Sequence, residues 1–228
     1  MTDHTAHVIA IDGPVASGKT TVGKALAVQL KYRFLDTGGM YRAVTWFAFQ
    51  RGVSDGDKRE LGSLARGLSF QIPGPINYSG SVLLVNGEDL SQVLRISEVN
   101  EKVSRVSAVS SVREALVKKQ RVLAGGGGIV MVGRDIGTNV LPNASLKIYL
   151  DASPEQRAHR RYQERLAEGS NTDYADELRE LEKRDKQDQE RRMAPLRPAD
   201  DAVVVLTDGL GVEEVTKLLM KLTGGMRR

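Results

Sequence analysis

The chain has 228 residues, of which 40% are apolar and 27% are charged, and it contains no cysteine. These values are typical of one soluble α/β domain with insertions, or of two small domains, and they exclude a long disordered chain. The lack of cysteine excludes disulfides and a thiol nucleophile, and it fits a reducing compartment. The net charge of +4 does not by itself indicate a nucleic-acid binder.

The N-terminal residues do not read as a secretory signal. Residues 1–7 lack the basic start and apolar core of a secretory signal. No stretch approaches the roughly 20 apolar residues that a membrane-spanning helix needs. Aromatic residues, which would stack on bases, make up only 5% of the chain. We therefore expect a cytoplasmic protein that has neither a membrane nor a nucleic acid as its partner.

Short apolar runs alternate with helical periodicity, which is typical of a mostly parallel sheet covered on both faces. Residues 7–11 form the first run and are apolar on both parities, as a doubly covered strand should be. Residues 22–30 then repeat apolar side chains at helical spacing. A second strand is expected at 33–35, followed by a helix over 41–48 that ends near Gly52.

Residues 68–96 interrupt this alternation. The runs at 68–72 and 82–85 predict two strands, and Asn86-Gly87 is a strong signal for an antiparallel turn. We expect a small β-rich insertion here. The rest of a single domain, spanning 1–228, would then have its core at about 7–67 and 97–222.

The second half returns to alternating strands and helices. Ser111 and Glu114 predict a capping box for one helix. Gly125–Gly128 suit a helix end and tight return better than a phosphate loop, because no helix start or lysine follows. Ser153 and Pro154 are good residues to begin another helix. A break at 169–171 would end this helix, and a charged helix would then reach about residue 192. Two more helices are expected around 99–106 and 215–222, and strands are expected at 129–132, 146–150 and 203–206.

The segment from Gly13 to Thr20 fits the pattern G-x-x-x-x-G-K-[ST], between a buried strand and a helix. Its glycines let successive backbone N–H groups point at phosphate oxygens, and the helix adds its positive end. Lys19 would reach the β- and γ-phosphates, and the Thr20 hydroxyl would ligate Mg²⁺. A glycine-rich turn without a ligand is the alternative, which the strand–loop–helix context disfavours. The residues expected to bind the nucleotide here are Gly13, Pro14, Val15, Ala16, Ser17, Gly18, Lys19, Thr20 and Thr21.

A P-loop alone does not separate kinases from other nucleotide enzymes. No N-K-x-D motif follows a later strand, which counts against a GTPase. The segment 36–42 follows the second strand and offers Thr37, Tyr41 and Arg42 to an acceptor opposite ATP. Alternatively, Tyr41 belongs to the core and Arg42 is solvated.

The segment 133–138 follows another buried strand, at the edge where open α/β sheets bind ligands. Arg134 could neutralise an acceptor phosphate there, and Asp135 could accept hydrogen bonds from an exocyclic amine. The alternative is an Arg134–Asp135 pair that holds a turn.

Nine arginines lie between Arg157 and Arg197. One interpretation is a solvated surface with ion pairs to the many glutamates. The other is a cluster that closes over polyphosphate, since arginine binds phosphate in a bidentate way.

Taken together, these stretches resemble the bacterial cytidylate (CMP/dCMP) kinases. The P-loop alone is common, but the combined set is specific and runs in family order over about residues 7–222. The resemblance implies an α/β P-loop kinase fold: a five-stranded parallel sheet flanked by helices, a β-rich monophosphate-binding insertion, and an Arg-rich lid at about 157–172. The matching segments are 11–20, 35–42, 112–115, 133–138, 149–152, 157–161 and 184–196.

The resemblance implies transfer of the ATP γ-phosphoryl group to CMP or dCMP by direct in-line attack. We expect a monomer whose partners are these small molecules. The implied catalytic residues are Lys19, Arg134, Arg161 and Arg191. The implied acceptor-phosphate residues are Thr37, Tyr41, Arg42, Arg134 and Arg191. Ser104, Arg113 and Asp135 would read cytosine, Arg184 and Asp188 would contact the sugar side, and Arg157, Arg160 and Arg161 would close on ATP.

One residue departs from the family pattern. Many members carry an acidic residue near Mg²⁺ where this chain has Val132. Thr20 and the nucleotide phosphates would then anchor the metal, with Asp36 or Asp12 contributing through water. Two other functions stay open: a kinase for another acceptor such as UMP, AMP or a small metabolite, and a nucleotide-dependent regulatory module with little turnover.

Overall fold

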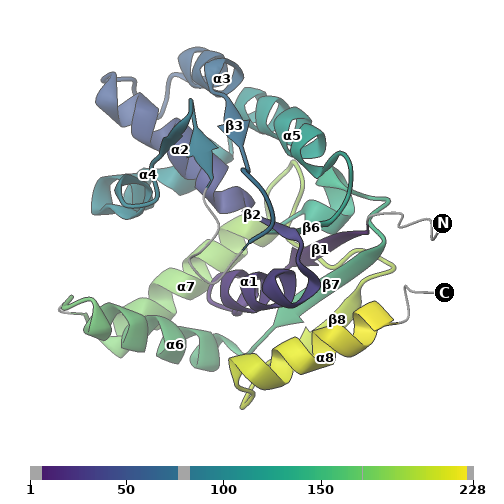
Figure 1. The fold of residues 1–228 in the computed structure, drawn as a ribbon. Coiled ribbons are helices and arrows are strands. Elements are labelled where there is room, and N and C mark those ends of the chain that lie inside the picture. The colour runs from purple at the N-terminus through teal and green to yellow at the C-terminus, as the bar shows by residue number, and fades with distance from the viewer. Residues whose placement is uncertain (1–6, 77–82, 171, 225–228) are drawn as a thin grey trace. The chain divides into compact units, whose positions relative to one another are not determined.

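The structure is a computed structural model that describes residues 7–76, 83–170 and 172–224 (Figure 1). Its main sheet has five strands in the order β2-β6-β1-β7-β8. The β1–β7 and β7–β8 pairs are parallel, as the alternation of strands and helices predicted. The strands of this sheet are β1 (Val8–Asp12), β2 (Arg33–Asp36), β6 (Ile129–Gly133), β7 (Leu146–Asp151) and β8 (Val203–Leu206).

This arrangement confirms the α/β fold class with helices flanking a parallel sheet. β6 is buried at every position, as expected for a strand covered on both faces. The chain also divides into two compact units, which are described separately. Among the described residues, one unit contains residues 7–8 and 27–131 and the other contains 9–26 and 132–224. The predicted single domain and the bounds of its lid stay predictions.

The first unit is built mainly from four helices. The pairs α3–α5 and α2–α4 pack against each other. Val99, Val103 and Val106 form the buried side of α4, at the spacing that predicted a helix there. The helices are α2 (Thr37–Gln50), α3 (Lys58–Gly67), α4 (Ser97–Ser107) and α5 (Ser110–Ala124), with a short 3-10 turn, η1 (Val93–Arg95).

The β-rich insertion is present in this unit as a small antiparallel sheet, β3 (Phe70–Gln71), β4 (Leu84–Val85) and β5 (Glu88–Asp89). The turn between β4 and β5 is Asn86-Gly87, and both residues have positive φ, as this turn type requires. The first strand is shorter than the predicted 68–72, because Leu68 caps α3 and Pro73 offers no N–H. Val82, in the predicted second strand, lies outside the described residues.

Two helix details of the first unit differ from the sequence prediction. Helix α3 was not predicted, although Asp57 caps it through the Glu60 N–H. The prediction of a capping box at Ser111 and Glu114 was wrong. α5 begins at Ser110, and the Ser111 hydroxyl instead donates to the Lys58 carbonyl at 3.0 Å.

The glycine run after α5 makes the tight return that was predicted. Gly126, Gly127 and Gly128 all have positive φ. The carbonyls of this return are bonded by Arg33, which donates to Leu123, Gly125 and Gly127. The guanidinium thus satisfies helix-end acceptors that would otherwise lack partners.

The second unit contains most of β1, together with β7, β8 and the three helices of the C-terminal part of the chain. In Figure 1, α6 (Pro154–Ala167) and α7 (Tyr174–Gln189) lie side by side, and they pack against each other. Ser153 caps α6 by accepting from the Gln156 N–H at 3.3 Å, as predicted. The predicted break also forms, with Gly169 at φ +75°; Asn171 lies outside the described residues. The closing helix is α8 (Val212–Gly224).

One unpredicted element follows β6: a π-helical turn, η2 (Ile136–Val140). The helix after the phosphate loop is α1 (Lys19–Leu30). In the described parts of the chain, no helix is long and apolar enough to cross a membrane.

Candidate nucleotide and acceptor sites

The phosphate loop connects β1 to α1 in a conformation that depends on glycine. Gly13 has φ +150°, and a Cβ on it would lie 2.0 Å from the Leu150 carbonyl oxygen. Gly18 has φ +91° and Ala16 φ +58°. These left-handed residues wrap the backbone so that its N–H groups can converge on an anion, as the motif requires.

Lys19 is buried against this loop. Its ammonium group donates to the Pro14 carbonyl and, at 3.1 Å, to the Ser17 hydroxyl. Thr20 follows it in the first turn of α1 and is half-buried. The lysine and the hydroxyl are therefore held at the loop and the helix N-terminus, where a bound polyphosphate would need them.

Asp12, the last residue of β1, is joined to the turn after β6. Its Oδ1 accepts the Ile136 N–H and its Oδ2 accepts the Gly137 N–H, each at 2.7 Å. Burial raises the pKa of this carboxyl to about 6 although both hydrogen bonds favour the charged form; nearby Asp135 raises the pKa further and Lys19 lowers it. From the sequence, Asp12 was expected only to contribute to Mg²⁺ binding through water.

Arg134 is ion-paired with Asp188 on α7. The Nε–Oδ2 distance is 2.9 Å, and Arg191 lies on the other oxygen at 3.5 Å. Burial raises the pKa of Asp188, but the charges of Arg134, Arg191 and Arg184 outweigh burial and hold it below its usual value. One carboxylate thus gathers three of the predicted acceptor-side arginines.

Asp135 is 5% exposed and accepts a hydrogen bond from the Asn139 amide at 3.0 Å. The alternative in which Arg134 and Asp135 hold the turn together finds no support, because the ion pair of Arg134 is to Asp188. Asp135 instead begins η2, whose Asn139 and Val140 N–H groups bond its carbonyl.

The predicted lid arginines differ in their surroundings. Arg157 is buried, pairs with Asp185 on α7, and donates to the carbonyls of Ala152 and Val15, so it contacts the phosphate loop directly. Arg160 donates to both the hydroxyl and the carbonyl of Thr207. Asp185 was missed as a partner, although its place three residues before Asp188 puts both on one face of α7.

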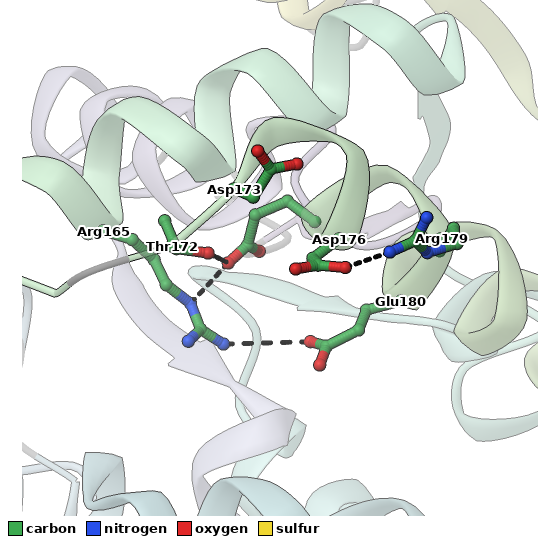
Figure 2. Close-up of a pocket in the computed structure, with 7 residues that line it drawn as sticks. Arg165, Thr172, Asp173, Asp176, Arg179 and Glu180 are labelled. Carbon is green, nitrogen blue, oxygen red and sulfur yellow. Dashed lines mark hydrogen bonds and ion pairs between the residues drawn. The ribbon is translucent and has the colours of Figure 1, made fainter.

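Arg161 pairs with Glu164 at 2.8 Å and lies 3.9 Å from Glu177. Figure 2 shows the neighbouring hollow of about 530 Å³ between α6 and α7, where Arg165 bridges Glu177 and Glu180. The remaining residues that line it are Thr172, Asp173, Asp176 and Arg179. On this surface the ion-paired interpretation of the arginines describes what is seen.

The residues predicted in the first unit gather where α2, α4 and α5 meet. Arg113 is 3% exposed, lies 5.7 Å from the centroid of the Tyr41 ring, and donates to the Ser107 carbonyl. Ser104 is half-buried one turn before Ser107, whose hydroxyl donates to the Ser104 carbonyl. The structure therefore brings together two of the three residues proposed to read cytosine, beside Tyr41.

The same unit holds Thr37 and Arg42 in the first half of α2. Thr37 is buried at the first position of this helix, next to Asp36, whose carboxylate accepts the Gly38 N–H at 3.0 Å. Arg42 donates to the Asn100 side chain and to the Leu94 carbonyl, so it is not merely solvated. Asn100 was missed because its pairing crosses from one helix to another.

Thr20 is the residue that the sequence predicts as a direct ligand of Mg²⁺. Within the described ranges, no group of three or more acidic, histidine or cysteine side chains is placed to hold a metal. Val132 is buried among the apolar residues of β6, and its side chain offers no oxygen. A hydroxyl at a P-loop helix start fits a hard cation that keeps most of its ligands from phosphate and water.

Comparison with known proteins adds a family to this geometry. The sequence profile described as "Cytidylate kinase" matches residues 9–224. The chain belongs to this family. It is 49% identical over 215 residues to the cytidylate kinase of Geobacillus kaustophilus (strain HTA426), covering 94% of this chain and 95% of that protein. It is 43% identical over 213 residues to the cytidylate kinase of Bacillus subtilis (strain 168), covering 93% and 94%.

Family membership makes ATP the phosphoryl donor for which the phosphate loop is built. Among solved structures, an uncharacterized protein from Eubacterium ventriosum ATCC 27560 aligns with a TM-score of 0.51 at 13% identity. That alignment covers 97% of this chain and 99% of the other. It shows a shared fold alone.

Proposed function

We propose that this chain transfers the γ-phosphoryl group of ATP to CMP and dCMP, producing ADP and CDP or dCDP in pyrimidine nucleotide metabolism. The observation that carries the proposal is the family match across residues 9–224, with cytidylate kinases at 43% and 49% identity over nearly the whole chain. The arrangement of the second unit supports it, because this unit contains both a phosphate loop and a separate set of arginines around Asp188.

On the donor side, the loop from Gly13 to Gly18 would cradle the ATP phosphates, and Lys19 would move its ammonium onto the β- and γ-phosphates. Mg²⁺, held by Thr20 and phosphate oxygens, would supply charge neutralisation there. Thr21 would support the same helix start. Arg157, Arg160 and Arg161 would complete the donor site from α6, with Arg157 acting through its bond to Val15.

On the acceptor side, Arg134 and Arg191 would hold the CMP phosphate, and Arg184 and Asp188 would contact the sugar side. Asp188 keeps these guanidinium groups together before the substrate binds, which lowers the entropy lost on binding. In the first unit, Thr37, Tyr41 and Arg42 would approach the acceptor phosphate, while Ser104 and Arg113, together with Asp135, would read cytosine.

The chemistry asks the protein for positioning and charge neutralisation, with no covalent enzyme intermediate. A phosphate oxygen of CMP is already anionic near neutral pH, so it attacks the γ-phosphorus without a general base. Lys19, Arg134, Arg161 and Arg191 would neutralise charge on the transferring group. Closure of the lid would exclude water and suppress wasteful ATP hydrolysis.

Two alternatives make different predictions. A kinase for UMP, AMP or a metabolite would keep the donor site and change the acceptor. A regulatory module would bind nucleotide with little turnover, although the arginines around Asp188 supply a second phosphate site that a simple switch does not need. We further propose that the protein acts as a cytoplasmic monomer with small-molecule partners and no nucleic acid or membrane.

A coupled assay for ADP release, run with and without CMP, separates these possibilities. We expect ADP release to depend on CMP and to fall to a small background without it. Release that is negligible in both conditions would support the regulatory module. Release that ignores CMP but responds to another acceptor would move the assignment to that acceptor.

A further inference from the structure

Asp12 makes a two-point contact with the turn that follows β6. Its side chain is buried, and its two oxygens accept the N–H groups of two successive residues, Ile136 and Gly137, each at 2.7 Å. Asp12 also directly precedes Gly13, the first residue of the phosphate loop. One carboxylate therefore joins the start of that loop to the segment that carries Arg134 and Asp135.

The first two N–H groups of the contacted turn have no acceptor within the turn itself. In η2, the N–H groups of Asn139 and Val140 return to the Asp135 carbonyl, and the Leu141 N–H returns to Ile136. The N–H groups of Ile136 and Gly137 come before these bonds and need acceptors from outside the turn. Asp12 supplies both, as a capping residue does for a helix but from a different strand.

The space around this contact is closed. A Cβ on Gly137 would lie 3.2 Å from the Lys147 side chain and 3.4 Å from Asp12 Oδ2. Lys147 itself is held by Asp201 at 2.8 Å. Gly137 therefore lies against both the Lys147 side chain and the Asp12 carboxylate, and the two hydrogen bonds to Asp12 connect the turn to β1.

We propose that Asp12 is a positioning residue for the phosphoryl acceptor: its carboxylate fixes the turn at Ile136 and Gly137 and thereby sets Arg134 and Asp135 toward the acceptor nucleotide. This inference rests on the proposed function. Arg134 is two residues before the contacted N–H of Ile136, so rotation of the turn would move its guanidinium away from Asp188 and Arg191.

A carboxylate suits this task better than a neutral side chain. It accepts on both oxygens, whereas asparagine would accept one N–H and turn its NH₂ group toward the other, leaving a buried donor unpaired. Retaining the charge is costly at a buried position, which explains why the pKa of Asp12 is raised by burial to about 6. The charged or titratable groups that face the Asp12 carboxyl are Lys19, Asp135, Lys147 and Tyr149. Tyr149 on β7 is the register partner of Asp12 in the β1–β7 pair.

Asp12→Asn tests the inference with Asp151→Asn as the matched control. Asp151 ends the neighbouring strand β7 and bonds the N–H of its own neighbour Ala152. In Asp12→Asn we expect the KM for CMP to rise about ten- to a hundredfold, with the KM for ATP changed less than about threefold. Asp151→Asn should leave both values close to wild type.

An unchanged KM for CMP in Asp12→Asn would overturn the inference. An equal rise in both KM values would also overturn it, because that pattern indicates a distorted phosphate loop. A wild-type enzyme that does not phosphorylate CMP would instead refute the proposed function, so the two failures are distinguishable.

The pH dependence supplies a readout that a purely structural role would not move. The phosphate of CMP also titrates near pH 6, so the useful quantity is the ratio of wild-type to Asp12→Asn kcat/KM at each pH. The ratio should be largest above pH 7 and fall toward one below pH 6, where protonated Asp12 resembles asparagine. A ratio that is the same at all pH values would contradict the account.

A measurement on the unaltered protein covers the case in which Asp12→Asn does not fold. The backbone amide resonances of Ile136 and Gly137 should shift together in a pH titration, with one midpoint near pH 6. Amides that do not titrate, or that titrate separately, would show that the carboxylate does not hold the turn.

Discussion

The phosphate loop and the α2–α4–α5 cluster are stabilised by different means. Around the loop, backbone conformation dominates: positive φ at Gly13 and Gly18, and bonds from Lys19 and Arg157 to loop carbonyls. Around Arg113, residues from three helices meet: the Tyr41 ring lies 5.7 Å from its guanidinium, and the Ser107 carbonyl accepts a hydrogen bond from it. The first arrangement is local in sequence and the second depends on helix packing.

We propose that the loop serves the chemistry and that the cluster serves the selection of the acceptor. The backbone of a phosphate loop recognises any triphosphate, so it can be shared among kinases with different acceptors. The packed cluster instead depends on the side chains that α2, α4 and α5 bring together. Substitutions near the loop should therefore reduce turnover with every acceptor, whereas substitutions in the cluster should change the choice of acceptor.

The largest expected effect is that of Lys19→Ala. Removal of the ammonium group should lower kcat roughly a thousandfold or more for every acceptor, because charge on the transferring group loses its partner. The fold should persist, because the loop conformation depends on the positive φ of Gly13, Ala16 and Gly18 and the variant keeps these residues. Circular dichroism and steady-state kinetics with CMP and UMP check this. Near-normal turnover would remove the loop from the mechanism.

Arg113→Met should have a smaller and selective effect. It keeps the length of the side chain and removes the charge, so the KM for CMP should rise about ten- to a hundredfold while the KM for ATP stays nearly constant. Arg105→Met is the matched control, because Arg105 is exposed on α4 and paired with Asp55 at the surface. Equal effects of the two variants would mean that the cluster does not select the acceptor.

Asp188→Asn tests the acceptor side of the second unit. Arg134 and Arg191 would lose their shared carboxylate, so we expect weaker CMP binding by about tenfold, measured by calorimetric titration. The lowered pKa of Asp188 means that its contribution to stability is present above the ordinary value near 3.8 and is lost as the pH falls through the lower folded value. Wild type should therefore lose stability in acid more steeply than this variant.

Asp12 should show the opposite linkage. Its pKa is raised from 3.8 to about 6, so the folded protein binds more protons between these values. The free energy of unfolding should then fall as the pH rises through this window, by an amount on the order of 3 kcal/mol from this residue. Urea unfolding of wild type and Asp12→Asn between pH 4 and 7 measures it. The same pH slope in both proteins would refute the linkage.

The smallest effect is expected in the hollow between α6 and α7. The Asp176–Arg179 pair is exposed on both sides. Asp176→Asn should change the free energy of unfolding by no more than about 0.5 kcal/mol and leave kinetics unaltered. A clear change in the KM for ATP would show that this surface takes part in lid closure.

Much of the framework was predictable because its signals are local. The phosphate loop, the Ser153 cap and the Asn86-Gly87 turn each depend on a few neighbouring residues, and all three formed as predicted. The Ser111 capping box failed because a tertiary acceptor, the Lys58 carbonyl, took the hydroxyl. Asp12 could not be assigned its contacts, since its partners lie more than 120 residues away in the sequence.

The arginines show the same limit. Composition indicated a cluster, but only the structure separates Arg157, buried with Asp185 and bonded to the loop, from Arg161, which is paired at the surface. Asp188 and Arg191 are three residues apart and could meet locally, whereas the pairing of Asp188 with Arg134 is visible only in the fold.

Steady-state kcat/KM for CMP, dCMP, UMP and AMP, each with saturating ATP, tests the central claim most directly. The account predicts that CMP and dCMP are the preferred acceptors, with UMP weaker and AMP poorest, because Ser104, Arg113 and Asp135 are proposed to read cytosine. A preference for AMP would contradict these roles and the assignment of the acceptor.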